Sequence, residues 1–284
     1  MPTTYAHWRF GVDCIETLPE NLQKVIHENR AIFDFGVHGP DVFFYDLKHP
    51  ELPQYGHSLH QETGKSFFGN CAKVYKENSE DKEKMLAYIL GLLSHYAFDS
   101  QAHAYINKKD LVTKSLTHNK IEAEYDAHLM RQDGKAIRTV NRAASLKPDK
   151  KDSEVMSRFF KFNAEDLYRT CKGQKLIIGA LYSRTKTARF AKDKIMRKFM
   201  SDSDADLLIQ DKELESCRDS NLRIDKLKEN ALKLYPELVD DFLKAVNEDK
   251  ELPDYFEHNF DPKPDDTTPV LSYEEELNYK PDFN

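Results

Sequence analysis

Residues 86–106 read LAYILGLLSHYAFDSQAHAYI, an apolar run that places His95, Asp99 and His103 four residues apart. Residues four apart project from the same face of a helix, so this spacing predicts two imidazoles and a carboxylate along one stripe. Burying such groups without partners costs roughly 2–7 kcal/mol each. The stripe therefore needs a strong polar partner, and a metal ion meets that need.

A second pair, His118 and Glu122, lies within THNKIEAEYD and is again spaced by four. Together the two stretches predict a multi-metal site. Zinc takes nitrogen and oxygen ligands from these residue types, and two zinc ions about 3.5–4 Å apart can clamp both oxygens of a phosphodiester displacement. The full candidate set is His7, Asp41, His57, His60, His95, Asp99, His103, His118 and Glu122. For each of these residues the alternative is a structural role, as a hydrogen-bonded core histidine, a turn residue or an exposed pair.

The bulk composition limits the class of protein. The 284 residues are 39% hydrophobic and 32% charged, which is typical of a globular chain with a very polar surface. The net charge of −7 argues against extended nucleic acid as a partner. The chain has no apolar run of about 18 residues and no signal-peptide pattern in MPTTYAHWRF. The four cysteines lack CxxC spacing, so we expect buried thiols and a cytoplasmic protein.

The pattern predicts an all-α protein. The expected helices span about 18–35, 60–78, 80–106, 118–131, 152–170, 173–200 and 218–247. Residues 42–60, with two prolines and a glycine, are expected to form a loop, and the end of the chain is expected to be irregular and to wrap back over the body. We therefore predict one helical-bundle domain, residues 1–250, with a tail at 251–284. The basic stretch 186–198 is either a solvated helix face or a contact with an anionic surface.

Five motifs occur in a characteristic order. They are TTYAHWRFG at 3–11, FGVHGPDVFFYD at 35–46, GHSLH at 56–60, HYAFDSQAHAYI at 95–106 and HNKIEAEYD at 118–126. In this order and spacing the chain resembles the zinc-dependent phospholipase C family, which is related to the secreted bacterial phospholipases C and the fungal single-strand nucleases. The resemblance covers about the first 130 residues and implies an α-helical bundle with a zinc cluster at the base of a cleft.

The resemblance also implies roles for the candidates. A first site would use His95 and Asp99 with a histidine from GHSLH, where His60 is favoured because it opens the next helix and His57 is the alternative. The second site would use His103, His118 and Glu122. A third would use His7, with Asp99 bridging two ions, and Asp41 would be the general base. The secreted enzymes also use an N-terminal tryptophan as a ligand, whereas this chain begins Met1-Pro2, so two or three zinc ions are expected.

The resemblance implies metal-assisted hydrolysis of a phosphodiester or phosphoester bond. A phospholipid is the first candidate substrate, and an enzyme that acts on phospholipids would contact the membrane surface. Two alternatives remain open at this point. One is an intracellular nuclease or nucleotide phosphohydrolase that uses the same metals, and the other is a non-catalytic protein that binds metal or partners.

Overall fold

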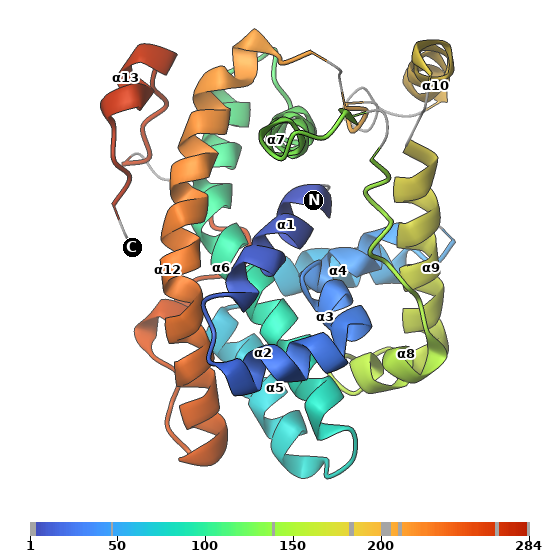
Figure 1. Ribbon diagram of the computed structural model, residues 1–284, viewed down its shortest axis with the longest axis vertical. Coiled ribbons are helices and arrows are strands. Elements are labelled where there is room, and N and C mark those ends of the chain that lie inside the picture. The colour runs from blue at the N-terminus through green and yellow to red at the C-terminus, as the bar shows by residue number, and fades with distance from the viewer. Residues whose placement is uncertain are drawn as a thin grey trace.

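The computed structural model describes residues 4–46, 48–137, 140–181, 185–199, 206–209, 212–264 and 267–282. Within these ranges the regular elements are helices, and the only strand-like feature is one isolated bridge between Thr63 and Asn259. The prediction of an all-α protein is therefore confirmed. Figure 1 shows the helices packed on one another in a bundle, with the long α6 running through it.

The α-helices are α1 (Thr4–Ile15), α2 (Glu20–Glu28), α3 (Arg30–Gly36), α4 (Glu51–Gln61), α5 (Gly64–Glu77), α6 (Lys82–Val112), α7 (His118–Gln132), α8 (Lys150–Ser157), α9 (Ala164–Leu181), α10 (Lys186–Phe199), α12 (Arg218–Asn247) and α13 (Tyr273–Asn278). The described residues also include the 3-10 helices η1 (Gly39–Tyr45), η3 (Glu215–Cys217) and η4 (Asp254–Glu257).

Helix α6 is the centre of the bundle, and α3 and α12 pack along it most extensively. Helix α3 crosses α6 at two glycines, Gly36 and Gly91. A Cβ atom on Gly36 would lie 2.5 Å from the Tyr88 carbonyl oxygen, and one on Gly91 would lie 2.6 Å from the Phe33 carbonyl oxygen. This close crossing sets the chain that follows α3, including η1, directly against the middle of α6.

The helix expected over residues 18–35 is wrong as a single element, because the chain breaks into α2 and α3 at Asn29. Asn29 has φ −122° and ψ 36°, and its side chain donates a hydrogen bond to the Val25 carbonyl. An asparagine side chain competes in this way with the backbone hydrogen bonds of a helix. The helix therefore breaks at Asn29, although the apolar pattern continues across the break.

The loop expected over residues 42–60 is also wrong, because this stretch forms most of η1 and all but the last residue of α4. Pro50 lies at the N-cap of α4 and Pro53 lies in its first turn, where a missing N–H leaves no hydrogen bond unmade. The prolines therefore start the helix rather than exclude it. Gly56 packs closely on η1, since a Cβ there would lie 3.1 Å from the Phe43 Cβ.

The starts of α5 and α6 differ from the predicted ranges, whereas the start of α7 matches. Helix α5 begins at Gly64 rather than near 60, with Thr63 as N-cap accepting a hydrogen bond from the Ser66 N–H. Helix α6 begins at Lys82 after Asp81 in the left-handed region (φ 55°), not after Ser79, and extends beyond 106 to Val112. The start of α7 after Thr117, which caps the Lys120 N–H, is confirmed.

In the second half, the helices expected at 152–170 and 173–200 are misplaced, whereas the one at 218–247 is confirmed as α12. The actual break after α8 is explained by Asn163, whose side chain accepts hydrogen bonds from the Glu165 and Asp166 N–H groups and so starts α9. The expected charged face at 186–198 falls on α10, where Phe190 and Ile195 are 72% and 58% exposed.

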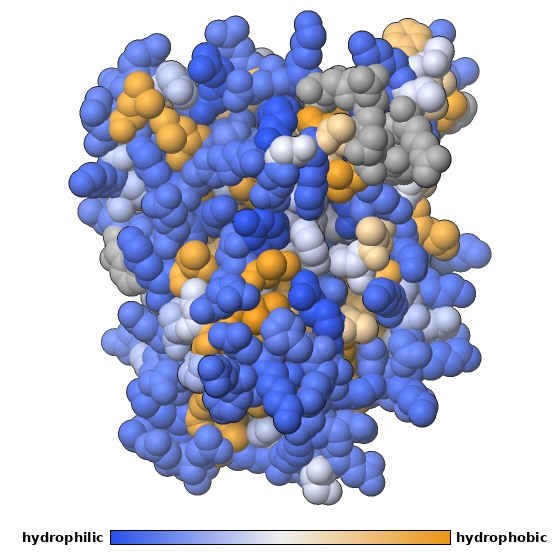
Figure 2. Space-filling view, viewed as in Figure 1, coloured by the Kyte–Doolittle hydropathy of each residue, from blue (hydrophilic) through white to orange (hydrophobic). Residues whose placement is uncertain are grey.

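The C-terminal segment wraps back over the body, as expected, although it contains η4 and α13 in addition to irregular chain. Glu276 of α13 is fully buried and forms a two-fold hydrogen-bonded ion pair with Arg223 of α12. The division at residue 250 stays a prediction. Figure 2 shows a face covered largely by hydrophilic residues, with hydrophobic ones in small groups. None of the described helices combines the length and apolar character that a membrane crossing requires.

Candidate metal centre

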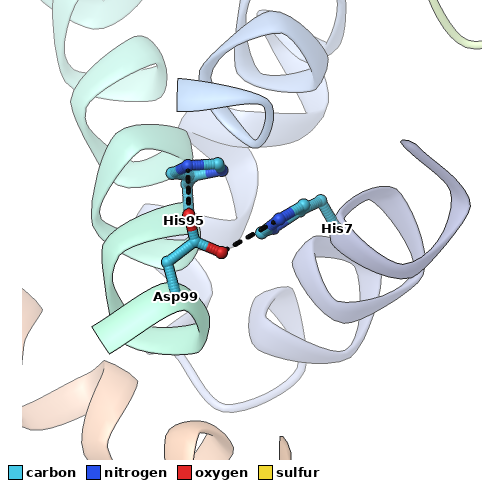
Figure 3. A group of neighbouring side chains, drawn as sticks. All are labelled: His7, His95 and Asp99. Atoms are coloured by element: carbon cyan, nitrogen blue, oxygen red, sulfur yellow. Dashed lines mark ion pairs between the residues drawn. The ribbon is translucent and has the colours of Figure 1, made fainter. Parts of the chain in front are cut away.

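Helix α6 presents His95, Asp99 and His103 on one buried face, as their spacing predicts. Asp99 Oδ2 lies 2.9 Å from His95 Nε2, and Asp99 Oδ1 lies 3.1 Å from Nε2 of His7 on α1 (Figure 3). His103 Nε2 lies 3.7 Å from the same Oδ1. Asp99 therefore stands between imidazoles from two helices, with an oxygen facing each.

The first turn of α1 is fixed by a buried carboxylate of α7. The backbone N–H groups of Tyr5 and Ala6 donate to Asp126 at 3.3 and 2.8 Å, and Arg142 pairs with the same carboxylate at 2.9 Å. N–H groups in the first turn of a helix have no partner within the helix, so Asp126 satisfies two of them. This contact orients α1 and thereby aims His7 at Asp99.

A second group forms where η1 meets α4 and α6. Asp41 of η1 places Oδ1 3.0 Å from His60 Nε2, and His95 completes the group. The close approach requires Gly39, which has φ +51° and where a Cβ would lie 2.3 Å from His95 Cδ2. Glycine is the residue that adopts this conformation without strain and leaves room for the His95 ring.

The third group joins the C-terminal half of α6 to the start of α7. Glu122 Oε1 lies 3.1 Å from His118 Nε2 and 3.4 Å from His103 Nε2. His7, Asp99, His103 and Glu122 together line a void of about 10 Å³. Glu122 is 1% exposed, whereas the His118 side chain is 24% exposed, so this group reaches towards the surface.

Among the described residues, the potential ligand atoms thus converge in three groups, within each of which they lie no more than 4.8 Å apart. The groups are His7/His95/Asp99, Asp41/His60/His95 and His103/His118/Glu122. They contain every candidate from the sequence except His57. The first two groups share His95, and the Asp99–His103 contact links the first to the third.

The outer ring nitrogens of four of these histidines are held by oxygen acceptors. The Nδ1 atoms lie 2.8 Å from the Gly56 carbonyl for His60, 3.2 Å from the Val37 carbonyl for His95, 2.9 Å from the Phe260 carbonyl for His103 and 2.9 Å from Asn107 Oδ1 for His118. An oxygen acceptor at Nδ1 requires the proton there, which leaves the Nε2 lone pair directed into the group. Metal-ligating histidines are oriented by outer contacts of this kind.

Several buried polar atoms of the three groups have no hydrogen-bond partner, which also fits a bound metal ion. His7 Nδ1, His95 Nε2 and Asp41 Oδ1 are buried and make no hydrogen bond, although His95 Nε2 lies 2.9 Å from Asp99 Oδ2 and Asp41 Oδ1 lies 3.0 Å from His60 Nε2. Buried polar atoms are normally hydrogen-bonded, so such atoms call for an explanation. The groups contain imidazole and carboxylate only, which is the ligand chemistry of zinc sites that keep an open position.

The zinc-dependent phospholipase C family model matches residues 6–172, which is more than half of the chain. The chain belongs to this family. No curated protein and no solved structure matches it. All three groups lie within the matched residues, whereas Met1 and Pro2 lie outside both the match and the described residues.

Neighbouring carboxylates and imidazoles in the buried centre shift the pKa values of Asp99 and His103. Burial would raise the pKa of Asp99, but the imidazoles of His103 and His95 hold it well below its usual value. Burial likewise opposes charge on His103, yet Asp99 and Glu122 raise the pKa of His103 to about 9. Zinc uptake by such groups displaces protons, so we expect proton release on binding.

Of the two histidines in GHSLH, the structure brings His60 into a group and leaves His57 outside. His57 is exposed, and its ring lies 4.6 Å from the ring of Phe44. Both line a cleft of about 380 Å³ that also reaches His60, His103 and His118. His57 therefore faces the cleft from its rim, three residues before the buried His60.

His38 is a buried neighbour of the centre that the sequence pattern did not place in the ligand set. It is 1% exposed and its Nε2 has no hydrogen-bond partner. Burial, followed by the charge of His7, lowers its pKa to about 3. His38 is therefore a neutral imidazole, and its position immediately before Gly39-Pro40-Asp41 was the available signal.

Proposed function

We propose that this member of the zinc-dependent phospholipase C family is a zinc-dependent hydrolase of phosphodiester or phosphoester bonds, with a phospholipid as the leading substrate. The observation that carries the proposal is the convergence of seven histidine and carboxylate side chains, together with the shared His95, from η1 and four helices. The Nε2 atoms of the five histidines face carboxylates, and outer contacts hold Nδ1 in four of them, which is an arrangement that suits a metal ion.

The ligand assignments follow the groups. His7, His95 and Asp99 would hold one ion, His60, His95 and Asp41 would surround a second position, and His103, His118 and Glu122 would hold another. Since His95 and Asp99 serve adjoining positions, two or three ions are proposed. The chemistry that zinc supplies when bound is polarisation of phosphoryl oxygens and acidification of a water molecule.

Asp41 is proposed as the residue that orients or deprotonates the attacking water. Its Oδ1 is buried without a hydrogen bond, beside His60 at 3.0 Å, so it has an acceptor position to offer. A carboxylate with a positioned lone pair can take the proton as the water attacks phosphorus. In an in-line displacement the leaving oxygen would depart on the side of the phosphorus opposite the attacking water.

The cleft favours a small phosphoester over a long polyanion. Its described lining consists of Phe44, His57, His60, Gln61, His103, Asn107, His118, Asn119 and Asp261. This lining includes no lysine or arginine, and the net charge of the chain is −7. Proteins that bind extended nucleic acid neutralise many phosphates with such residues.

A nucleotide phosphoester is the second candidate substrate, and one observation favours it. The paired rings of Phe44 and His57 at the rim of the cleft offer a surface on which a base can stack. Hydrolysis by this route would use the same ligands and the same Asp41. The two substrates are therefore distinguished by turnover, not by metal content.

The proposal is tested by metal content and turnover measured together. Elemental mass spectrometry of the purified wild type should give two or three zinc ions per chain, and His95→Ala should lose zinc because His95 belongs to two groups. The control is His27→Ala, which removes an exposed histidine of α2 and should keep the full zinc content. Phospholipid micelles, a small aryl phosphodiester and a dinucleotide are then compared as substrates.

The outcomes distinguish the two candidate substrates from each other and from a non-catalytic role. Zinc with phospholipid turnover supports the leading proposal, and zinc with preferred cleavage of the dinucleotide supports the second candidate. Zinc bound without hydrolysis of any of the three would leave a non-catalytic metal-binding protein. Failure of the wild type to take up zinc would refute the hydrolase assignment.

A further inference from the structure

Residues 255–261 form a segment, here called the C-terminal strap, that follows α12 and lies outside the family-matched stretch. Backbone hydrogen bonds fix it to the α4–α5 junction: the Gly64 N–H donates to the His258 carbonyl at 2.8 Å, and the Asp261 N–H donates to the His60 carbonyl at 3.2 Å. The Tyr96 hydroxyl of α6 bonds to the same His258 carbonyl at 3.0 Å. The strap is therefore held firmly between α4, α5 and α6.

Two hydrogen-bonded contacts join the strap to the outer side of the group His103/His118/Glu122, and Asp261 Oδ1 also lies 3.7 Å from His103 Nδ1. The first is the Phe260 carbonyl, which accepts from His103 Nδ1 at 2.9 Å. Phe260 is fully buried, so this carbonyl has little freedom to move. The contact fixes the ring of His103 and places the proton on Nδ1.

The second contact is a relay from Asp261 through Asn107 to His118. Asp261 Oδ1 accepts from Asn107 Nδ2 at 2.7 Å, and Asn107 Oδ1 lies 2.9 Å from His118 Nδ1. An ionised carboxylate can only accept, so the amide must turn its NH₂ group to Asp261 and its oxygen to His118. His118 Nδ1 must then carry the proton, which leaves Nε2 with its lone pair 3.1 Å from Glu122 Oε1.

The carboxylate at the start of this relay is itself held in place. Gln61 Nε2 donates to Asp261 Oδ2 at 3.2 Å, so both oxygens of Asp261 are engaged. The Asp261 side chain is 34% exposed and lines the cleft without belonging to any of the three groups. Asp261 is therefore connected to the candidate ligands through hydrogen bonds but is not itself a candidate ligand.

We propose that the C-terminal strap positions the ligands of the group His103/His118/Glu122, with Asp261 acting through Asn107 to set which ring nitrogen of His118 carries the proton. This inference rests on the proposed zinc function and adds residues outside the family-matched stretch to it. Outer contacts to metal-ligating histidines are worth about 10–100-fold in metal affinity. Because Asp261 acts through one intermediate residue, the lower end of that range is expected.

The test measures zinc affinity of the metal-stripped full-length protein by competition with a chelating indicator. Asp261→Asn keeps the shape but removes the obligatory acceptor, and it should weaken one zinc site about tenfold while the others are unchanged. The matched control is Asp254→Asn, the same substitution at an exposed aspartate seven residues earlier, which should bind zinc as the wild type does.

A second variant probes the relay itself. Asn107→Leu removes the acceptor that directly contacts His118, so it should weaken the same site at least as much as Asp261→Asn. Because Asp261 acts through Asn107, the double variant Asn107→Leu/Asp261→Asn should bind zinc with the same affinity as Asn107→Leu alone. Additive losses in the double variant would contradict the relay.

The failure of this inference can be told apart from the failure of the proposed function. If the wild type binds zinc and Asp261→Asn binds it with unchanged affinity at every site, the positioning role is wrong and the zinc function stands. If Asp261→Asn alters only the KM for substrate, Asp261 contacts substrate and does not position His118. If the wild type binds no zinc, both proposals fall together.

Discussion

The family-matched part of the chain, residues 6–172, and the part that follows it contribute to the candidate metal centre in different ways. The matched part supplies all the grouped side chains, whereas the later part supplies contacts behind them, such as the Phe260 carbonyl and Asp261. Ligands must be particular residue types at particular positions. A backbone carbonyl can come from any residue, so the supports leave a weaker trace in the sequence than the ligands do.

The largest effect is expected from Asp99→Ala, which strikes the matched part at its most connected residue. Asp99 faces His95 and His7 with separate oxygens and lies 3.7 Å from His103, so its loss should empty at least one zinc position. Activity should fall by at least about 10³-fold, the scale seen when an essential group is removed. Elemental mass spectrometry and turnover rates measure the two losses.

The control for Asp99→Ala is Asp110→Ala, an exposed aspartate on the same helix α6, which should keep both zinc and activity. Asp99→Asn retains the shape of the side chain and separates loss of charge from loss of packing. Retention of full zinc content by both Asp99 variants would remove this residue from the centre.

How much of this centre was predictable depends on the range of the contact. The stripe His95, Asp99 and His103 follows from spacing alone, because a helix brings residues four apart together whatever surrounds it. His118 and Glu122 follow for the same reason. The packing of α1 and η1 against α6 joins residues about 50–90 positions apart in sequence, and for those the ordered motifs, rather than periodicity, indicated the partners.

The remaining differences have local physical causes. Spacing does not distinguish His57 from His60, and only the packing of α4 against η1 buries one and exposes the other. The prolines of α4 act as helix starters, and Asn29 breaks a helix whose apolar pattern continues. Phe260 was not predictable as a support, because its side chain packs in the core while its carbonyl makes the contact.

Asp41→Asn should sharpen the comparison within the matched part by separating binding from chemistry. Asparagine keeps one oxygen that can face His60 and a metal, so most zinc should remain. It is a much poorer proton acceptor, so activity should fall by about 10²–10⁴-fold, the usual contribution of a general base. The measurement pairs kcat with zinc content in the same preparation.

The result for Asp41→Asn can fail in two informative ways. Full activity would show that Asp41 neither orients nor deprotonates the water. A zinc loss as large as that of Asp99→Ala would show that the charge of Asp41 is required for metal binding, and the base would then have to be sought elsewhere.

Glu276→Gln tests the later part of the chain, where we expect a loss of stability without a loss of ligands. Glu276 is 0% exposed and pairs with Arg223, whose guanidinium lies 4.8 Å from the ring of Tyr105 on α6 and 4.0 Å from that of Tyr279. Removing one member of a buried ion pair leaves the other charge uncompensated, which costs about 3–5 kcal/mol. Urea unfolding should show this decrease, while zinc content under native conditions stays that of the wild type.

Glu274→Gln, on the exposed side of the same short helix, is the matched control and should leave the unfolding midpoint unchanged. If Glu276→Gln instead lost zinc while keeping its stability, the division between a ligand-bearing part and a supporting part would be wrong.

The smallest effect is expected at α10, which lies beyond the matched residues and whose sequence, KTARFAKDKIMRKF, is strongly basic. Phe190 is 72% exposed there, and a basic helix with an exposed aromatic side chain suits an anionic lipid surface. Phe190→Ser should reduce binding to phosphatidylserine-containing vesicles about 10- to 150-fold, because burying such a side chain contributes about 1.5–3 kcal/mol. Leu111→Ser removes an equally exposed apolar residue from the end of α6 and should bind vesicles as the wild type does. Hydrolysis of a soluble phosphodiester should be the same in both variants, since neither residue lines the cleft. Equal vesicle binding by the two variants would assign α10 to the solvated surface and confine the interaction with lipid to the cleft itself.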